Sequence, residues 1–218
     1  MEIISNFTFR YKVTTIFVVI LFYAVGVLGI VIPITHAFFV ALIPVVLLLS
    51  FVLVVMFHNS SQNRSDFLVF LLIFLSSFFV EVLGVNTHLI FGNYSYGEGL
   101  GIKIFGTPLM IGINWVLLIY SSASILELTR WPAVIQVFLA SFLMVLFDLI
   151  LEHVAPLLDM WEWHENTIPI QNYLAWFALA LIFQGIQKRM KISTVNPVAS
   201  TIFICQFIFF ITILILLN

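Results

Sequence analysis

The feature that most constrains this chain is a series of apolar runs, each about as long as a bilayer is thick. A helix crosses the hydrocarbon core with about 20 predominantly apolar residues. Only 18 of the 218 residues are charged (8 Lys and Arg plus 10 Asp and Glu), and the mean hydropathy is +1.20, so a water-facing surface cannot be built around a core this large. We therefore predict an all-α polytopic membrane protein, one domain over residues 1–218. Its seven expected transmembrane helices are Val13–Ile32, His36–Phe57, Phe67–Ile90, Pro108–Leu126, Pro132–Val154, Pro169–Gln187 and Pro197–Leu217.

The distribution of basic residues sets the expected orientation of these helices. Cytoplasmic segments of membrane proteins are enriched in Lys and Arg. If the N-terminus is inside, the outer segments hold only Lys103, and the inner segments hold Arg10, Lys12, Arg64, Arg130, Lys188, Arg189 and Lys191. This pattern predicts N-in and C-out, in a membrane such as the bacterial inner membrane. The formal net charge of −2 offers no basic surface for nucleic acid, and nothing in the sequence indicates an oligomeric state.

Three acidic residues lie inside the predicted helices, toward their outer ends. Glu81 is in the third run, and Asp148 and Glu152 are four residues apart in the fifth, on one helix face. Intramembrane acids usually face the bundle interior and serve a function. Two like charges at this spacing repel, so at least one of the pair is expected to hold a proton, as acid–base catalysis requires. Alternatively, the acids only tie helices together, with Glu81 bonded to Asn114 or Asn172.

Aromatic residues gather around the same ends of the predicted helices. Two outer segments, residues 91–107 and 155–168, carry Tyr94, Tyr96, Trp161 and Trp163, which could form an ordinary interfacial belt. Two other tryptophans lie deeper, within the apolar runs, and each has an amide nearby in the sequence: Asn114 precedes Trp115, and Asn172 precedes Trp176 by four residues. An aromatic lining beside protonatable carboxylates suits carbocation chemistry, because ring faces stabilise a cation without adding to it.

Metal and cofactor sites have little support in the sequence. His88, His153 and His164 lack the spacing of a histidine metal site, and Cys205 is the single cysteine. The last apolar run has no lysine for a retinal Schiff base, and no phosphate-binding glycine loop is present. We therefore expect neither a metal nor a cofactor.

Two blocks of the sequence carry distinctive motifs. The first block reads Glu81-Val-Leu-Gly-Val-Asn86-Thr, Phe91-Gly-Asn-Tyr94-Ser-Tyr96-Gly, Leu100-Gly, Gly106-Thr-Pro-Leu and Asn114-Trp115. The second contains Asp148, Glu152, Ala155, Leu158-Asp, Trp161-Glu-Trp163, Pro169 and Gln171-Asn172-Tyr-Leu-Ala-Trp176. Together the two blocks resemble a small membrane family of carotenoid-biosynthesis proteins. That family includes carotenoid 1,2-hydratases of the γ-carotene 1′,2′-hydratase and bisanhydrobacterioruberin hydratase types. His88 departs from the family pattern, which usually has a small residue there.

The resemblance implies a cofactor-independent hydro-lyase that adds water across the terminal C1=C2 double bond of an acyclic carotenoid end group. The partners are then an apolar carotenoid, water and membrane lipid. The implied catalytic residues are Glu81, Asp148 and Glu152, and the implied substrate-binding residues are Asn86, Tyr94, Tyr96, Asn114, Trp115, Trp161, Trp163, Asn172 and Trp176. Two alternatives stay open: a carotenoid or isoprenoid cyclase or isomerase with the same acid initiation, and a non-catalytic membrane protein that binds an apolar lipid.

The unequal distribution of Lys and Arg between the two sides gives a testable topology. Reporter fusions after Asn63 and after Glu165 should report opposite sides of the membrane, the first cytoplasmic and the second external. Reports from the same side would show that the predicted helix count or orientation is wrong.

Overall fold

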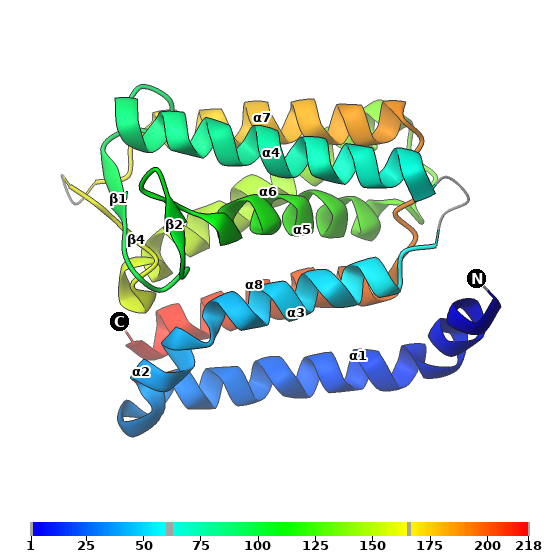
Figure 1. Cartoon of the computed structure of the whole chain (residues 1–218), viewed down its shortest axis with the longest axis horizontal. Coiled ribbons are helices and arrows are strands. Elements are labelled where there is room, and N and C mark those ends of the chain that lie inside the picture. Colours follow the sequence, from blue (N-terminus) through cyan, green and yellow to red (C-terminus); the bar gives the residue numbers. More distant parts are fainter. Residues whose placement is uncertain (1, 60–62, 165–166, 218) are drawn as a thin grey trace.

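The fold is a bundle of long helices with a small irregular cap at one end (Figure 1). The computed structural model describes residues 2–59, 63–164 and 167–217. Within these ranges there are eight α-helices: α1 Glu2–Val31, α2 Pro33–Ala41, α3 Ile43–Met56, α4 Asn63–Thr87, α5 Leu109–Leu126, α6 Ala133–Val154, α7 Ile170–Arg189 and α8 Pro197–Leu217. A proline stands at the start of α2 and α8 and directly before α5, α6 and α7, where its missing N–H costs a helix nothing.

The structure supports a membrane protein but gives fewer clear spans than the sequence predicts. Among the described residues, five helices (α1, α4, α5, α6 and α8) are long and apolar enough to cross a bilayer. The predicted second span is broken, because α2 and α3 meet at 54° and count as a sixth span only if taken together. Pro44, near the start of α3, cannot donate a backbone hydrogen bond across that junction. α7 is not among these helices; it carries several glutamines and ends in Lys188 and Arg189.

The long helices lie nearly parallel in successive layers, and the short α2 is inclined to them (Figure 1). α4 and α7 form one side of the bundle, α5 and α6 come next, then α3 and α8, with α1 outermost. α5 is central, packing against α3, α4, α6, α7 and α8, and its residues Leu117, Leu118 and Ile119 are fully buried. α1 packs mainly against α8 and α2. The chain begins at one end of the bundle and finishes at the other.

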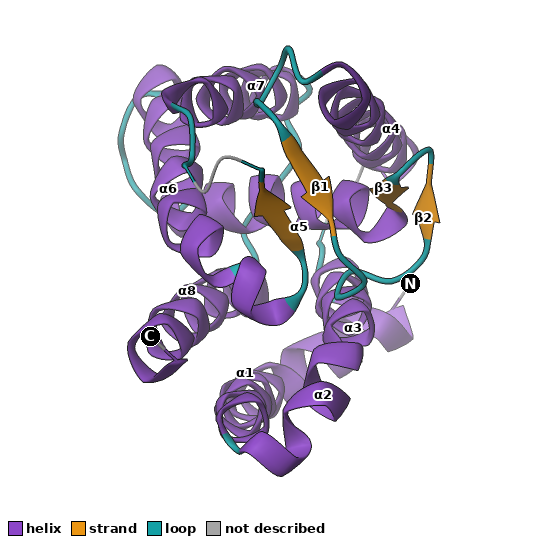
Figure 2. Ribbon diagram, turned by 90° about the vertical axis from the view of Figure 1, so that its left-hand side faces the viewer, coloured by secondary structure: helices purple, strands orange, loops and turns teal. Residues whose placement is uncertain are grey.

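Four short strands form the cap, a feature that the all-α prediction missed. β1 (Tyr94–Tyr96) pairs antiparallel with β4 (Trp161–Trp163), and β2 (Lys103–Ile104) pairs with β3 (Thr107–Pro108). A 3-10 turn, η1 (Pro156–Leu158), links α6 to β4. Figure 2 looks onto this end, where β1 and β4 lie across the mouth of the bundle. The two outer segments thus pair with each other.

The β1–β4 sheet continues into a close contact between the glycine-rich segment and Asp159. The N–H groups of Gly97 and Gly99 donate to the carbonyl oxygens of Met160 and Asp159, at 2.9 and 2.6 Å. A Cβ built on Gly97 would stand 2.2 Å from Asp159 Oδ1, and one on Gly99 would stand 2.3 Å from the carbonyl oxygen of Leu158. Only glycine lets the two segments approach this closely.

The opposite end of the bundle is held by polar contacts between helices. His58, just after α3, bonds Asp66 of α4 through Nε2 at 2.8 Å and the hydroxyl of Tyr120 of α5 through Nδ1 at 2.9 Å. Lys188 of α7 donates to Glu127, which follows α5, at 2.9 Å. These contacts fix the helix ends remote from the cap.

The glycine contact gives a prediction about stability. Gly97→Ala should lower the free energy of unfolding by about 1–3 kcal/mol, because the added methyl group overlaps Asp159. Gly185→Ala is the matched control, since a Cβ there meets nothing within 4 Å. Thermal unfolding in detergent should show a lower midpoint for Gly97→Ala only; equal midpoints would contradict the packing described.

Candidate active site

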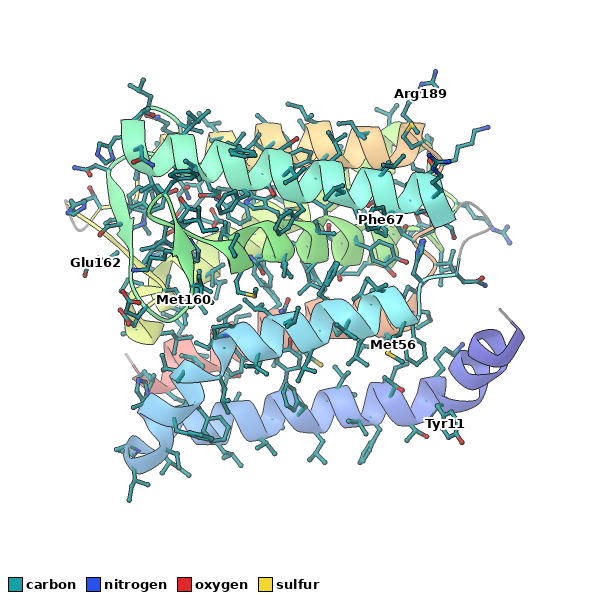
Figure 3. All side chains as sticks on the ribbon, in the orientation of Figure 1. Tyr11, Met56, Phe67, Met160, Glu162 and Arg189 are labelled. Atoms are coloured by element: carbon teal, nitrogen blue, oxygen red, sulfur yellow. The ribbon has the colours of Figure 1, made fainter. Side chains whose placement is uncertain are left out.

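The inner face of the β1–β4 sheet carries four aromatic side chains. Successive strand residues point to opposite faces, and the register pairs Tyr94 with Trp163 and Tyr96 with Trp161. All four rings therefore lie on the face toward the helices, while Glu162 points away from the bundle (Figure 3). Trp161 and Trp163 are buried, so they do not form the interfacial belt that the sequence left open.

Glu81 of α4 receives three hydrogen bonds from uncharged donors. The hydroxyls of Tyr94 and Tyr96 donate to Oε2 at 2.7 and 2.8 Å, and the indole N–H of Trp115 donates to Oε1 at 2.9 Å. Glu81 as a whole is only 3% exposed. The sequence offered Asn114 or Asn172 as its partner, but the structure supplies the tyrosines and the indole instead.

Glu152 of α6 has a matching set of three donors. The indole N–H groups of Trp161 and Trp163 donate to Oε2 at 2.8 and 2.7 Å. The side-chain amide of Asn172, on α7, donates to Glu152 Oε1 at 2.9 Å and also to Asp148 Oδ2 at 2.9 Å. Asn172 thus bridges the two acids that the i, i+4 spacing places on one helix face.

Asp148 differs from the two glutamates in its hydrogen bonding. It is fully buried, and within the described ranges its Oδ1 has no hydrogen-bond partner. A buried carboxyl oxygen without a donor is costly when charged. None of the three acids forms an ion pair with a described residue; the salt bridges involve Asp66, Glu98 and Glu127.

A small cavity lies between Glu81 and Glu152. Its volume is about 10 Å³, which is room for about one water molecule. The walls are Glu81, Phe91, Tyr94, Tyr96, Ile111, Glu152, Trp161, Trp163, Asn172 and Trp176. Two carboxylates from different helices therefore face a water-sized space lined mainly by aromatic rings.

The two deeper indoles stack beside this cavity, and only Trp176 lines it. Trp115 and Trp176 stack with ring centroids 4.3 Å apart and planes inclined by 27°. Trp115 is completely buried and Trp176 is 4% exposed. Because Trp115 also donates to Glu81, the stack joins α5 and α7 to the acid on α4.

The structure brings most, but not all, of the predicted site residues together. Asn86 is exposed and donates to the carbonyl oxygens of Val82 and Phe105, outside the cavity. Asn114 is buried on α5 but does not line the cavity. Phe91 and Ile111, which line it, were missed because nothing distinguishes them from the many other apolar residues of the chain.

The described residues of the site do not form a cluster of metal ligands. Among residues 2–59, 63–164 and 167–217, no three His, Cys, Asp or Glu side chains converge as metal ligands would. The donors that face the acids are hydroxyl, indole and amide groups, which stabilise negative charge on oxygen.

The comparisons with known proteins identify the family. The model of a family described as "Carotenoid biosynthesis protein" matches residues 42–218, a stretch that contains every residue of the site. The chain belongs to this family. The resemblance seen in the two sequence blocks is thus confirmed, and the protein is a membrane protein of carotenoid biosynthesis. Comparisons with curated proteins and with solved structures give no match.

The tyrosines in the cap supply a pH test of the site. Burial raises the pKa of Tyr94 well above the ordinary value of 10.0, and the negative charge of Glu81 raises it further; the same causes raise the pKa of Tyr96. Both hydroxyls therefore stay protonated, and their stabilising contribution persists at pH values below about 10 and is lost only as the pH rises through the higher folded-state pKa.

In an ultraviolet titration of tyrosinate, Tyr94→Phe should leave the number of tyrosines that ionise by about pH 10 unchanged, provided the variant stays folded. Loss of one ionising tyrosine from that range would show that the Tyr94 hydroxyl is not held as described.

Proposed function

We propose that this protein is a carotenoid hydratase that adds water across the terminal C1=C2 double bond of an acyclic end group. The observation that carries the proposal is the water-sized cavity between Glu81 and Glu152, roofed by the aromatic sheet. Hydration of such an alkene needs a proton donor, a shelter for a tertiary cation, one water molecule and a base. The side chains around the cavity offer a group for each requirement, and the cavity itself has room for the water molecule.

The acid is the pair formed by Asp148 and Glu152, which share one proton and are joined by Asn172. Glu152 lines the cavity, so it delivers the proton to C2 while Asp148, whose Oδ1 lacks a partner among the described groups, shares the proton with it. Protonation of C2 breaks the double bond and leaves the positive charge on C1. The faces of Trp176 and the sheet aromatics stabilise that charge.

The base is Glu81, on the opposite wall of the cavity. The water oxygen forms its bond to C1, and one of the water protons passes to the Glu81 carboxylate. That proton then returns through water to the Asp148–Glu152 pair, so the acids are regenerated and the sum is alkene plus water giving a tertiary alcohol. No redox change occurs, and the proposed reaction needs no cofactor.

The site belongs to the outer leaflet if the predicted topology holds. The seven-to-one distribution of basic residues supports an inner N-terminus. α7 is more polar than the other long helices but lies beside α4 and α6 (Figure 1), and this position supports the proposal that it is a seventh span. The cap and all three acids then lie at the outer face of the membrane, with the carotenoid in the lipid beside them.

A cyclase or isomerase remains the second candidate, because it uses the same initial protonation. The cation is then lost by attack of an internal double bond or by proton loss, and the product has the mass of the substrate. The carboxylates on both sides of a water-sized cavity favour hydration. In cells that accumulate acyclic carotenoids, the proposed hydratase should yield pigments heavier by one water molecule, and an unchanged mass would favour the second candidate.

Substitutions of the acids test the assigned roles. Glu81→Gln and Asp148→Asn preserve shape but remove the ionisable carboxyl group, so turnover should fall by about 100-fold or more, with folded protein retained. Glu162→Gln is the control, since Glu162 is exposed on the outer face of β4 and should keep full turnover. Product yield per folded protein measures the effect; full activity in either site variant removes that residue from the mechanism, whereas loss of folded protein in both favours a purely structural role.

A further inference from the structure

A second cavity lies at the capped end of the bundle, between α1, α3 and α8. Its volume is about 110 Å³. The walls are almost entirely apolar and include Phe22, Leu47, Met160 and Phe209. A dry apolar cavity of about 150 Å³ accommodates benzene, so this one accommodates the last few carbons of a slender chain.

The cavity opens on the flank of the bundle. Phe22 and Val25, both on α1, line it and are 42% and 46% exposed. α1 lies beside α3 in Figure 1 but packs mainly on α8 and α2. A ligand can therefore enter between α1 and α3, from the side that faces lipid when α1 spans the membrane.

One polar group in the wall lacks a partner. Gln206 of α8 lines the cavity and is 3% exposed, and within the described part of the chain its Oε1 accepts no hydrogen bond. Tyr23, another lining residue, is hydrogen-bonded to Ser50 at 3.0 Å and to the Gln206 side chain, so only the amide oxygen of Gln206 is left without a partner. An unpaired buried amide oxygen is costly, and a hydroxyl group on an otherwise apolar ligand would satisfy it.

The cavity adjoins the acid cluster. Met160 lines the α1–α3–α8 cavity, and the next residue, Trp161, lines the cavity between the acids. Phe210 of α8 lines the larger cavity and packs against Phe147, with ring centroids 5.6 Å apart; Phe147 directly precedes Asp148. Figure 3 shows Met160 between the layer of α5 and α6 and that of α3 and α8. The flexible Met160 side chain can yield to a passing chain end.

We propose that this cavity binds the hydroxylated end of an acyclic isoprenoid chain and is the product site of the enzyme. The identity of the chain rests on the proposed function: hydration gives a hydrocarbon end group its first hydrogen-bond donor. The hydrated end therefore satisfies Gln206, and the unreacted end does not. Moving the product end past Met160 separates it from the acids, which would otherwise catalyse the reverse dehydration.

Binding in an Asp148→Asn background tests this site without turnover. The probes are an acyclic polyene with a terminal tertiary alcohol and the same polyene without it, measured by quenching of tryptophan fluorescence in detergent. The alcohol should bind about tenfold tighter. Adding Gln206→Met, which keeps the side-chain size, should abolish that preference and leave hydrocarbon binding unchanged.

A variant that fills the cavity tests whether the preference for the alcohol arises there. Gly26 lines the cavity opposite Phe209, so Gly26→Leu should fill it and weaken alcohol binding by about tenfold or more. Leu28→Phe, on the exposed face of the same helix at 62% exposure, should change nothing.

Three outcomes would overturn the proposal: equal affinity for both polyenes, a preference that survives Gln206→Met, or equal competition by a straight-chain primary alcohol, which would assign the cavity to membrane alcohols. If the wild-type protein still hydrates its substrate normally, any of these outcomes refutes the proposed product site but not the proposed function. A clear alcohol preference without hydration in the wild type refutes the proposed function instead.

Discussion

The structure depends on hydrogen-bond donors for the carboxylates that are buried in its apolar bundle. A buried charge without a partner is prohibitively costly, and this chain provides no basic side chain at the acids within its described residues. It provides uncharged donors instead: two tyrosines and an indole for Glu81, and two indoles and an amide for Glu152. A hydrogen bond to a charged group contributes about 1.5–3 kcal/mol to stability. The three hydrogen bonds to each glutamate therefore stabilise the fold substantially.

The cap exists to place those donors. The two tyrosines of β1 donate hydrogen bonds to Glu81, and the two tryptophans of β4 donate hydrogen bonds to Glu152. The sheet therefore joins α4 and α6, two helices that are far apart in the sequence. The glycine segment that packs on Asp159 holds the strands in register. Neutral donors also leave the acids free to exchange a proton, which a Lys or Arg partner would oppose by fixing the carboxylate form.

Hydropathy and spacing were enough to locate the acids, because a charged residue stands out in an apolar run, and i, i+4 spacing fixes the common face of Asp148 and Glu152. The hydrogen-bond partners of Glu81 were not predicted, since they lie 13 to 34 residues farther along the chain, in β1 and α5. The alternation in Tyr94-Ser-Tyr96 and Trp161-Glu-Trp163 was a usable strand signal. Phe91 and the α1–α3–α8 cavity carried no signal, because apolar composition is uniform along this chain.

The family match begins at residue 42, after α1 and α2, yet α1 supplies one wall of the larger cavity. The acid cluster thus lies wholly in the matched part, while the lipid-facing access includes a segment before it.

The most direct test of the account is the origin of the oxygen in the product. The purified protein, given an acyclic carotenoid in water labelled with heavy oxygen, should form a tertiary alcohol that carries one labelled oxygen atom per hydrated end, and Glu81→Gln should form none. A product with no labelled oxygen, or a cyclised product of unchanged mass, would contradict hydration at this acid cluster.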